Sequence, residues 1–384
     1  MSTYVGSNEA ARRLGVSTST LYAYVSRGRI TRRRSADGRT SLFDVGELER
    51  LAERSRRPTG PRPTIDVRIS SSITSIGEDA VEVRGHDLCE LARHRSFEAV
   101  CELLWTGALV DTPPAWPRPS ADERQRLDSL ATSALPPVAR LAVAAHLLEA
   151  PPDRTIAVAR DRNADAFSPA RRLICNAPDV LGSPRRTGPI ARRLAAAWIT
   201  RPGDSAVRAI DTVLVLLADH ELATSTLAVR VAASARASMS TSIAAGLATL
   251  DGPLHGAAAA EACGFLDECG ARGIEEAIRR RRRLGEVLPG FGHKVYRDRD
   301  PRFETAMEAV RAAGDDGLAD ELVTCVARVL PKPPNIDLAL AALIRCLELP
   351  TDAPLFAVAR IAGWAAHHAE EFAEAPLRFR GVTS

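Results

Sequence analysis

The sequence contains no apolar run long enough to cross a membrane. No stretch approaches the about eighteen consecutive apolar residues that a spanning helix requires. A continuous apolar segment of the kind found in secretory leaders is also missing near the start of the chain. We therefore expect a cytoplasmic protein that does not bind membranes.

Cysteine is sparse and forms no recognisable pattern. The seven cysteines are odd in number and include no C-x-x-C pair, which favours free thiols in a reducing compartment over a disulfide framework. No cluster of cysteine and histidine has the spacing of zinc ligands. The sequence predicts neither a disulfide-bonded scaffold nor a metal site.

An alternating strand–helix rhythm and a repeat of fixed period are absent as well. From Asp66 onward the chain is rich in alanine, leucine, arginine and glutamate, all good helix formers. Apolar residues recur every three or four positions in segments such as "DLCELARHRSFEAVCELLWTG". The segment "SITSIGEDAVEVRG", residues 72–85, is typical of a short strand or of irregular structure. We expect a body that is mainly α.

Charge is divided unevenly along the chain. Up to Pro63, thirteen arginines stand against six acidic residues, a net charge of +7. Because the whole chain carries +3 at pH 7, the remainder carries −4. This asymmetry indicates a basic N-terminal module attached to a mildly acidic body.

The basic module has the element order of a small DNA-binding domain. "NEAARRLGVSTSTLYAYVSRGRI" predicts two short helices with a turn at Gly15, and Asp37-Gly38 is a strong hairpin signal. Asp44 and Glu47 have the spacing of a capping box before a third helix. Residues 1–54 thus resemble the winged helix-turn-helix of the MerR and excisionase type. Residues 55–65, with their proline, glycine and arginine, predict a semi-rigid linker.

The resemblance implies a DNA-binding surface. Thr18, Ser19 and Tyr22 would lie on the recognition helix. Arg32, Arg33 and Arg34 would approach phosphates from the hairpin. The alternative is that this arginine run is a solvated face, or packs against the acidic body.

Three of the eight histidines lie where helical periodicity breaks. His220 occurs in "LADHELATST", His255 in "DGPLHGAAAAEA" and His293 in "LPGFGHKVYRDRDPR". Glycine or proline beside such a residue lets backbone and side chain line a cleft. A lone histidine of this kind is more often structural than catalytic, so the neighbouring motifs decide.

A carboxylate and two arginines accompany these histidines. In "LPKPPNIDLALAAL", Asn335 is placed to cap a helix and Asp337 falls in its first turn, where the helix dipole favours the ionised form. Arg302 and Arg360 carry planar guanidinium groups suited to binding carboxylates. Taken singly, Asp337 would be a helix-end stabiliser and each arginine an ion-pair partner.

Five motifs together resemble the citrate synthase family. "HELATST", "GPLHG", "PGFGHKVYRDRDPR", "PNID" and "AVARIAGWAAH" occur in the order and approximate spacing of that family. The resemblance covers about residues 66–384. It implies a large helical domain of residues 66–256 and 349–384, a small helical domain of residues 257–348, and a homodimer.

The resemblance also implies roles for individual residues. Asp337 would remove a methyl proton from an acyl-CoA thioester, His255 would stabilise the resulting enolate, and His293 would polarise the ketone of oxaloacetate. His220, Arg302 and Arg360 would hold the dicarboxylate. The backbone at Gly290 and Gly292 would lie against coenzyme A, which takes part as a thioester substrate; no other cofactor is implied.

The sequence departs from the family in three places. Ala257 follows Gly256 where the family has a second glycine, and Leu338-Ala-Leu-Ala follows Asp337 where an aromatic residue and Ser-Gly are usual. The chain ends in "EAPLRFRGVTS" instead of the segment whose arginine reaches the partner's substrate. Arg380 is our choice for that arginine, with Arg378 the alternative.

Two functions follow from this combination. The first is condensation of acetyl-CoA, or another short acyl-CoA such as propionyl-CoA, with oxaloacetate. The second is a DNA-binding transcriptional regulator that uses a citrate-synthase-like body as a metabolite sensor. A sensor has no need of a general base, so Asp337, His255 and His293 together favour catalysis.

Overall fold

The computed structural model describes residues 4–14, 16, 18–26, 30–35, 40–48, 68–77, 80–149, 166–185, 187–220, 222–293, 295–296 and 298–380. The predicted turns at Gly15 and at Asp37-Gly38, and the predicted linker 55–65, lie outside these residues. The described residues fall into two compact units. One comprises residues up to 69 together with 272–288, and the other comprises 70–271 and 289–384.

The N-terminal part contains the two predicted helices and the predicted hairpin, and one additional strand. Its elements are β1 (Tyr4–Gly6), α1 (Ser7–Leu14), α2 (Thr18–Ser26), β2 (Arg32–Arg34) and β3 (Ser41–Asp44). The antiparallel sheet has the order β1-β3-β2, with Arg33 opposite Leu42. Strand β1 was not predicted, because three residues are too few to show a period of two.

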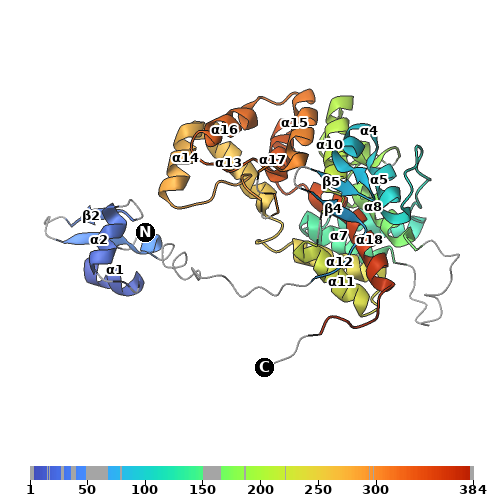
Figure 1. The fold of residues 1–384 in the computed structure, drawn as a ribbon, viewed down its shortest axis with the longest axis horizontal. Helices are drawn as coiled ribbons and strands as arrows, with labels where there is room; N and C mark the ends of the chain where they lie inside the picture. Colours follow the sequence, from blue (N-terminus) through green and yellow to red (C-terminus); the bar gives the residue numbers. More distant parts are fainter. Residues whose placement is uncertain are drawn as a thin grey trace. The chain divides into compact units, whose positions relative to one another are not determined.

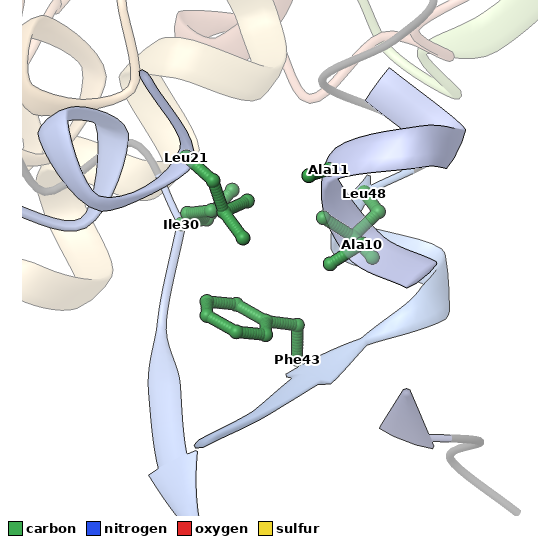
Figure 2. Packing of buried hydrophobic residues seen from close by; sticks show 6 residues of the cluster. All are labelled: Ala10, Ala11, Leu21, Ile30, Phe43 and Leu48. Atoms are coloured by element: carbon green, nitrogen blue, oxygen red, sulfur yellow. The ribbon is translucent and has the colours of Figure 1, made fainter. Parts of the chain in front are cut away.

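This part has an apolar core of its own. Figure 2 shows its buried side chains facing a common interior between the helices and the sheet. They are Ala10, Ala11, Leu21, Ile30, Phe43 and Leu48. The predicted capping box is half formed: Asp44 Oδ1 accepts from the Glu47 amide at 3.0 Å, but the Glu47 carboxylate accepts from the Thr31 amide at 2.9 Å. Glu47 thereby ties the third helix to the start of the hairpin.

The second unit begins with a small sheet and continues as helices. Strands β4 (Thr74–Ile76), β5 (Val81–Val83) and β6 (His86–Asp87) pair antiparallel in sequence order, so the segment that was ambiguous from sequence is a three-stranded meander. The helices, shown in Figure 1, are α4 (Leu88–His94), α5 (Phe97–Thr106), α6 (Ala121–Ala131), α7 (Pro137–Leu147), α8 (Ser168–Val180), α9 (Ile190–Trp198), α10 (Asp204–Leu217), α11 (Thr224–Ser234), α12 (Met239–Leu250), α13 (Ala258–Arg272), α15 (Pro301–Ala312), α16 (Leu318–Ala327), α17 (Ile336–Cys346) and α18 (Leu355–Phe372). Helix α14 (Ile274–Arg283) belongs to the first unit. The prediction of a mainly α fold is confirmed.

Helix α18 is the centre of the second unit. It packs against α5, α8, α10, α11 and α12 (Figure 1). Its residues 357–368 are all buried. Trp364 is fully buried, and Gly246 of α12 lies so close to it that an added Cβ would stand 3.0 Å from the indole ring. Small residues on α12 therefore allow the helix axes to approach.

Within the described residues, no helix is both long and apolar enough to cross a membrane.

Candidate active site

The glycine turn before His293 is held against the start of α17. Gly290 and Gly292 have φ of +82° and +80°, a backbone conformation that favours glycine. The Asn335 amide donates to Gly290 O at 2.9 Å, and Asn335 Nδ2 donates to Gly292 O at 2.8 Å. A Cβ at Gly290 would stand 2.8 Å from Leu338 Cβ. Two motifs more than forty residues apart are thus locked together.

Asp337 lies where the sequence predicted, in the first turn of α17 beyond the cap. Asn335 is the N-cap, and its Oδ1 accepts from the Asp337 amide at 3.0 Å. Burial of the carboxyl raises the pKa of Asp337 to about 6, although Arg302 and Arg360 oppose the shift. The helix end, which we expected to favour the ionised form, does not set the direction of the shift, because desolvation is the largest contribution. The result is a carboxyl that titrates near neutral pH.

Arg302 is buried and bound by a carboxylate that the sequence analysis did not single out. Asp300 Oδ1 accepts from Arg302 Nε at 2.9 Å, and Oδ2 accepts from Nη2 at 2.8 Å. Asp300 Oδ2 also accepts from the Ile336 amide at 3.0 Å. Burial alone would raise the pKa of Asp300, but the adjacent Arg302 holds it below the ordinary value. Asp300 thus fixes Arg302 relative to Asp337. The Asp-Pro pair at a helix start is the sequence feature by which Asp300 could have been identified.

Two histidines and a tyrosine meet beside Arg302. His220 Nε2 lies 2.8 Å from the Tyr296 hydroxyl, and the His220 and His293 ring centroids are 5.4 Å apart. The Arg302 guanidinium lies 5.5 Å from the centre of the Tyr296 ring. Burial, together with Arg302, Arg360 and His293, lowers the pKa of His220 far below its ordinary value. His220 is therefore neutral in this cluster. Tyr296 was missed, since nothing in "KVYRD" sets it apart.

The proton position on His293 follows from its backbone contacts. Its Nδ1 accepts from the amide of Val295 at 3.1 Å. A neutral imidazole that accepts at one nitrogen carries its proton on the other. His293 therefore presents an Nε2–H donor, the form that can polarise a carbonyl oxygen.

Arg360 is buried on α18. Its Nε donates to Leu217 O at 2.9 Å, and its guanidinium lies 4.6 Å from the centre of the Phe356 ring. Burial lowers the pKa of Arg360 to about 10, with Asp219 and Asp337 acting in the opposite direction. The guanidinium remains charged at neutral pH. Through their mutual electrostatic effects, Arg302, Arg360 and Asp337 form one cluster.

His255 is placed by a contact with α11. Its Nε2 accepts from the Ser225 amide at 3.3 Å and lies 2.8 Å from the Ser225 hydroxyl. Because Nε2 accepts, a neutral His255 carries its proton on Nδ1. Thr224, where α11 begins, is only four residues beyond His220. Ser225 was missed as well, because nothing in the sequence sets it apart.

A cavity of about 340 Å³ is lined in part by Gly256, the residue that follows His255 in the chain. Gly256, Ala257, Leu340, Ile344 and Phe356 are among its lining residues. Phe356 also contacts Arg360. Both Ala257 and Leu340, which belong to the departures from the family pattern, thus face this space.

The C-terminal arginines differ in their surroundings. Arg378 donates to both carboxylate oxygens of Glu371, at 2.6 and 2.5 Å. Arg380 is exposed. Arg378 is thus engaged within its own chain, which keeps Arg380 as our choice for a carboxylate ligand.

The predicted DNA-contacting residues lie on the N-terminal helices and sheet. Arg32, Arg33 and Arg34 form β2 and are all exposed. Thr18 is exposed at the start of α2, and the Tyr22 hydroxyl lies 3.1 Å from the Ser7 hydroxyl. The Ser19 side chain lies outside what the structure describes.

Among the described residues, no group of three or more His, Cys, Asp or Glu side chains is arranged to hold a metal ion.

A helical fold that gathers neutral histidines, buried arginines and a carboxyl of raised pKa is typical of an acid–base enzyme that acts on carboxylates. Residues 66–380 match the family described as "Citrate synthase, C-terminal domain", and residues 4–56 match "Helix-turn-helix domain". The chain belongs to the citrate synthase family and carries an N-terminal helix-turn-helix domain, as the motifs predicted.

Known relatives agree with this assignment. "Citrate synthase 2" of Bacillus subtilis is 28% identical over 347 residues, which cover 80% of this chain and 90% of that protein. The structure of citrate synthase from Pyrobaculum aerophilum is 24% identical with a TM-score of 0.67, covering 92% of this chain and 94% of that one. Citrate synthase from Thermoplasma acidophilum, solved in a ternary complex with carboxymethyl coenzyme A and oxaloacetate, is 22% identical with a TM-score of 0.59, covering 83% and 93%.

Proposed function

We propose that the protein condenses a short acyl-CoA, acetyl-CoA by default, with oxaloacetate. The observation that carries this proposal is Asp337, a carboxyl with a pKa of about 6 beside two buried arginines. A base is most effective when its pKa lies near the working pH, since it is then ionised yet still basic. A residue that only stabilised a helix end would gain nothing from this shift.

The residues present can carry each step. Asp337 takes a proton from the methyl carbon next to the thioester carbonyl, and the carbonyl oxygen gains negative charge. The Nδ1–H of His255 donates to that oxygen. The enolate carbon then forms a bond to the ketone carbon of oxaloacetate, whose oxygen receives the Nε2 proton of His293. Water hydrolyses the thioester and releases coenzyme A and a tricarboxylate.

The oxaloacetate carboxylates would be held by His220, Arg302 and Arg360. Arg302 and Arg360 supply two positive charges, and Asp300 is ion-paired with Arg302. A dicarboxylate would therefore find two buried guanidinium groups that can donate hydrogen bonds to its oxygens. Arg380 of a second copy would add a further cation in a homodimer, and the backbone at Gly290 and Gly292 would lie against coenzyme A.

Release of free thiol from purified protein tests this function. Acetyl-CoA and propionyl-CoA are each mixed with oxaloacetate, and the thiol is followed by its reaction with an aromatic disulfide. We expect release that requires oxaloacetate and is abolished in Asp337→Asn. Absence of release with both thioesters, or full activity in Asp337→Asn, would refute the proposal.

A second function is favoured by the N-terminal domain. We propose that its helix-turn-helix and the exposed Arg32, Arg33 and Arg34 bind DNA, which would allow the chain to act as a regulator that senses metabolites. Binding to the gene's own upstream DNA, measured with and without oxaloacetate, tests this function. Loss of affinity as salt is raised is the expected signature.

A further inference from the structure

A line of buried polar side chains runs from the end of α18 to the residue before His220. Arg230 Nε donates to Glu371 Oε2 at 2.9 Å, and Arg230 Nη1 lies 3.0 Å from His367 Nδ1. His367 Nε2 lies 3.4 Å from Asp219 Oδ1. All four residues are at most 1% exposed. None of them takes part in the steps proposed above.

The donors and acceptors along this line can be assigned. A guanidinium offers only donors, so His367 Nδ1 must accept from Arg230. A neutral His367 then carries its proton on Nε2, which faces Asp219 Oδ1. The other oxygen of Asp219 accepts from the Thr74 hydroxyl at 2.5 Å. The Thr74 hydroxyl on β4 therefore holds one carboxylate oxygen, and the other faces His367 Nε2 on α18.

The backbone around Asp219 is pressed against α18. The Gly363 amide donates to Ala218 O at 3.0 Å. A Cβ at Gly363 would stand 2.3 Å from Asp219 Oδ1 and 2.6 Å from Ala218 O. Only glycine lets the segment approach the helix this closely.

Two of the predicted carboxylate ligands, His220 and Arg360, depend on the segment of residues 217–220. His220 is the next residue after Asp219, and Arg360 donates to Leu217 O at 2.9 Å. Asp219 also acts electrostatically on Arg360. A displacement of residues 217–220 would move one ligand and remove the hydrogen bond that orients the other.

We propose that Asp219, His367, Arg230 and Glu371 form a positioning network that holds residues 217–220, and with them His220 and Arg360, in the geometry that binds the dicarboxylate. The proposal rests on the proposed function, because it assumes that oxaloacetate occupies this site. Groups that bind a ligand tightly must be held by their neighbours before it arrives. The network acts on the binding of the keto acid and not on proton transfer at Asp337.

The test compares His367→Leu with His367→Gln. Glutamine can accept from Arg230 through Oε1 and donate to Asp219 through Nε2, whereas leucine can do neither. His368→Leu is the matched control, since it removes a buried imidazole from the same helix that is not part of the network. Oxaloacetate binding is measured by calorimetry on the full chain, and kcat and KM by thiol release.

We expect His367→Leu to raise the Kd and KM for oxaloacetate by at least about tenfold, the scale of a misplaced binding group. Its kcat and its KM for acetyl-CoA should stay within about twofold, because uniform binding alone is lost. His367→Gln should recover most of the affinity, and His368→Leu should bind oxaloacetate as the wild type does. An unchanged Kd in His367→Leu, or equal losses in His367→Leu and His368→Leu, would overturn the proposal.

A milder pair of variants covers the case in which His367→Leu does not fold. Thr74→Val removes only the hydroxyl that holds Asp219 Oδ2, and Thr74→Ser keeps it. We expect weaker oxaloacetate binding in Thr74→Val and wild-type binding in Thr74→Ser; equal affinity in the two would overturn the network. Absence of oxaloacetate binding by the wild type would instead refute the proposed function itself.

Discussion

Asp300 binds Arg302 through both carboxylate oxygens, and one of those oxygens also accepts the amide of Ile336, the residue before Asp337. One carboxylate therefore fixes the distance between the proposed substrate-binding cation and the proposed base. The helix start that brings it there is the Asp-Pro-Arg sequence, in which Asp300 is the N-cap of α15.

Replacing Asp300 by asparagine should reduce both stability and keto-acid binding. Breaking a buried ion pair from one side leaves an uncompensated charge, which costs about 3–5 kcal/mol. We expect a lower midpoint of unfolding and a raised KM for oxaloacetate. Asp298→Asn, an exposed carboxylate on the same segment, is the control and should change neither. Equal behaviour of the two variants would contradict the assignment.

The activity should rise with pH through about 6. Asp337 must be ionised to act as a base, and its pKa is raised to about 6, so kcat should fall as the pH drops below that value. A pH profile of kcat at saturating substrates measures this. A flat profile between pH 5 and 8 would exclude Asp337 as the base in this pH range.

The raised pKa of Asp337 also makes the stability of the folded protein depend on pH. The folded pKa of Asp337 exceeds the ordinary value of 3.8, so the native state binds more protons between those two values and loses relative stability as the pH rises through about 6. Asp337→Asn should therefore be more stable than the wild type at pH 8, by about 1–3 kcal/mol. The gain should vanish near pH 3. Denaturant unfolding of both proteins at each pH isolates the contribution of Asp337, and a gain independent of pH would contradict it.

Gly290→Ala should be more harmful than an alanine at another glycine of positive φ. Both Gly290 and Gly314 have positive φ, but only Gly290 faces a neighbour, Leu338. The backbone penalty of about 1–2 kcal/mol is shared by both variants. Any further loss of stability in Gly290→Ala then measures the steric conflict with α17. The kcat should fall in Gly290→Ala alone. Equal losses of stability in the two would mean that the contact with Leu338 is unimportant.

Arg380 and Arg378 should differ in what their removal changes. Arg380→Ala should raise the KM for oxaloacetate by about 10- to 100-fold, the equivalent of one charge-assisted hydrogen bond, with little change in the unfolding midpoint. Arg378→Ala should instead lower the midpoint, because Glu371 loses one of its partners. The reverse pattern would assign the carboxylate contact to Arg378.

Replacing Arg32, Arg33 and Arg34 by alanine should weaken DNA binding at all sequences alike. Each lost phosphate contact also lowers the salt dependence of binding. Alanine at Arg279, Arg280 and Arg281 of α14 removes the same net charge and is the matched control. DNA titrations at several salt concentrations distinguish the β2 variant from the α14 control. Equal affinity and equal salt dependence in the wild type and the β2 variant would show that β2 is not part of the DNA interface.

The features of the candidate site that could be predicted from the sequence are those that belong to short local motifs. Asn335 as a cap and Asp337 in the first turn are local features, and both were confirmed by the structure. The direction of the pKa shift at Asp337 was not predictable, because burial comes from elements distant in the chain. The contact between Asp219 and His367 was not predictable for the same reason: the two residues lie 148 positions apart, and His367 lies in ordinary helical sequence.

Gly363 has a consequence for engineering. Glycine inside a helix costs about 1 kcal/mol relative to alanine, and replacing it is a common way to make a helix more stable. At this position the replacement would push α18 away from Ala218 and Asp219. Thermostabilised versions of this protein must therefore keep glycine at position 363 of α18, and find their gains elsewhere.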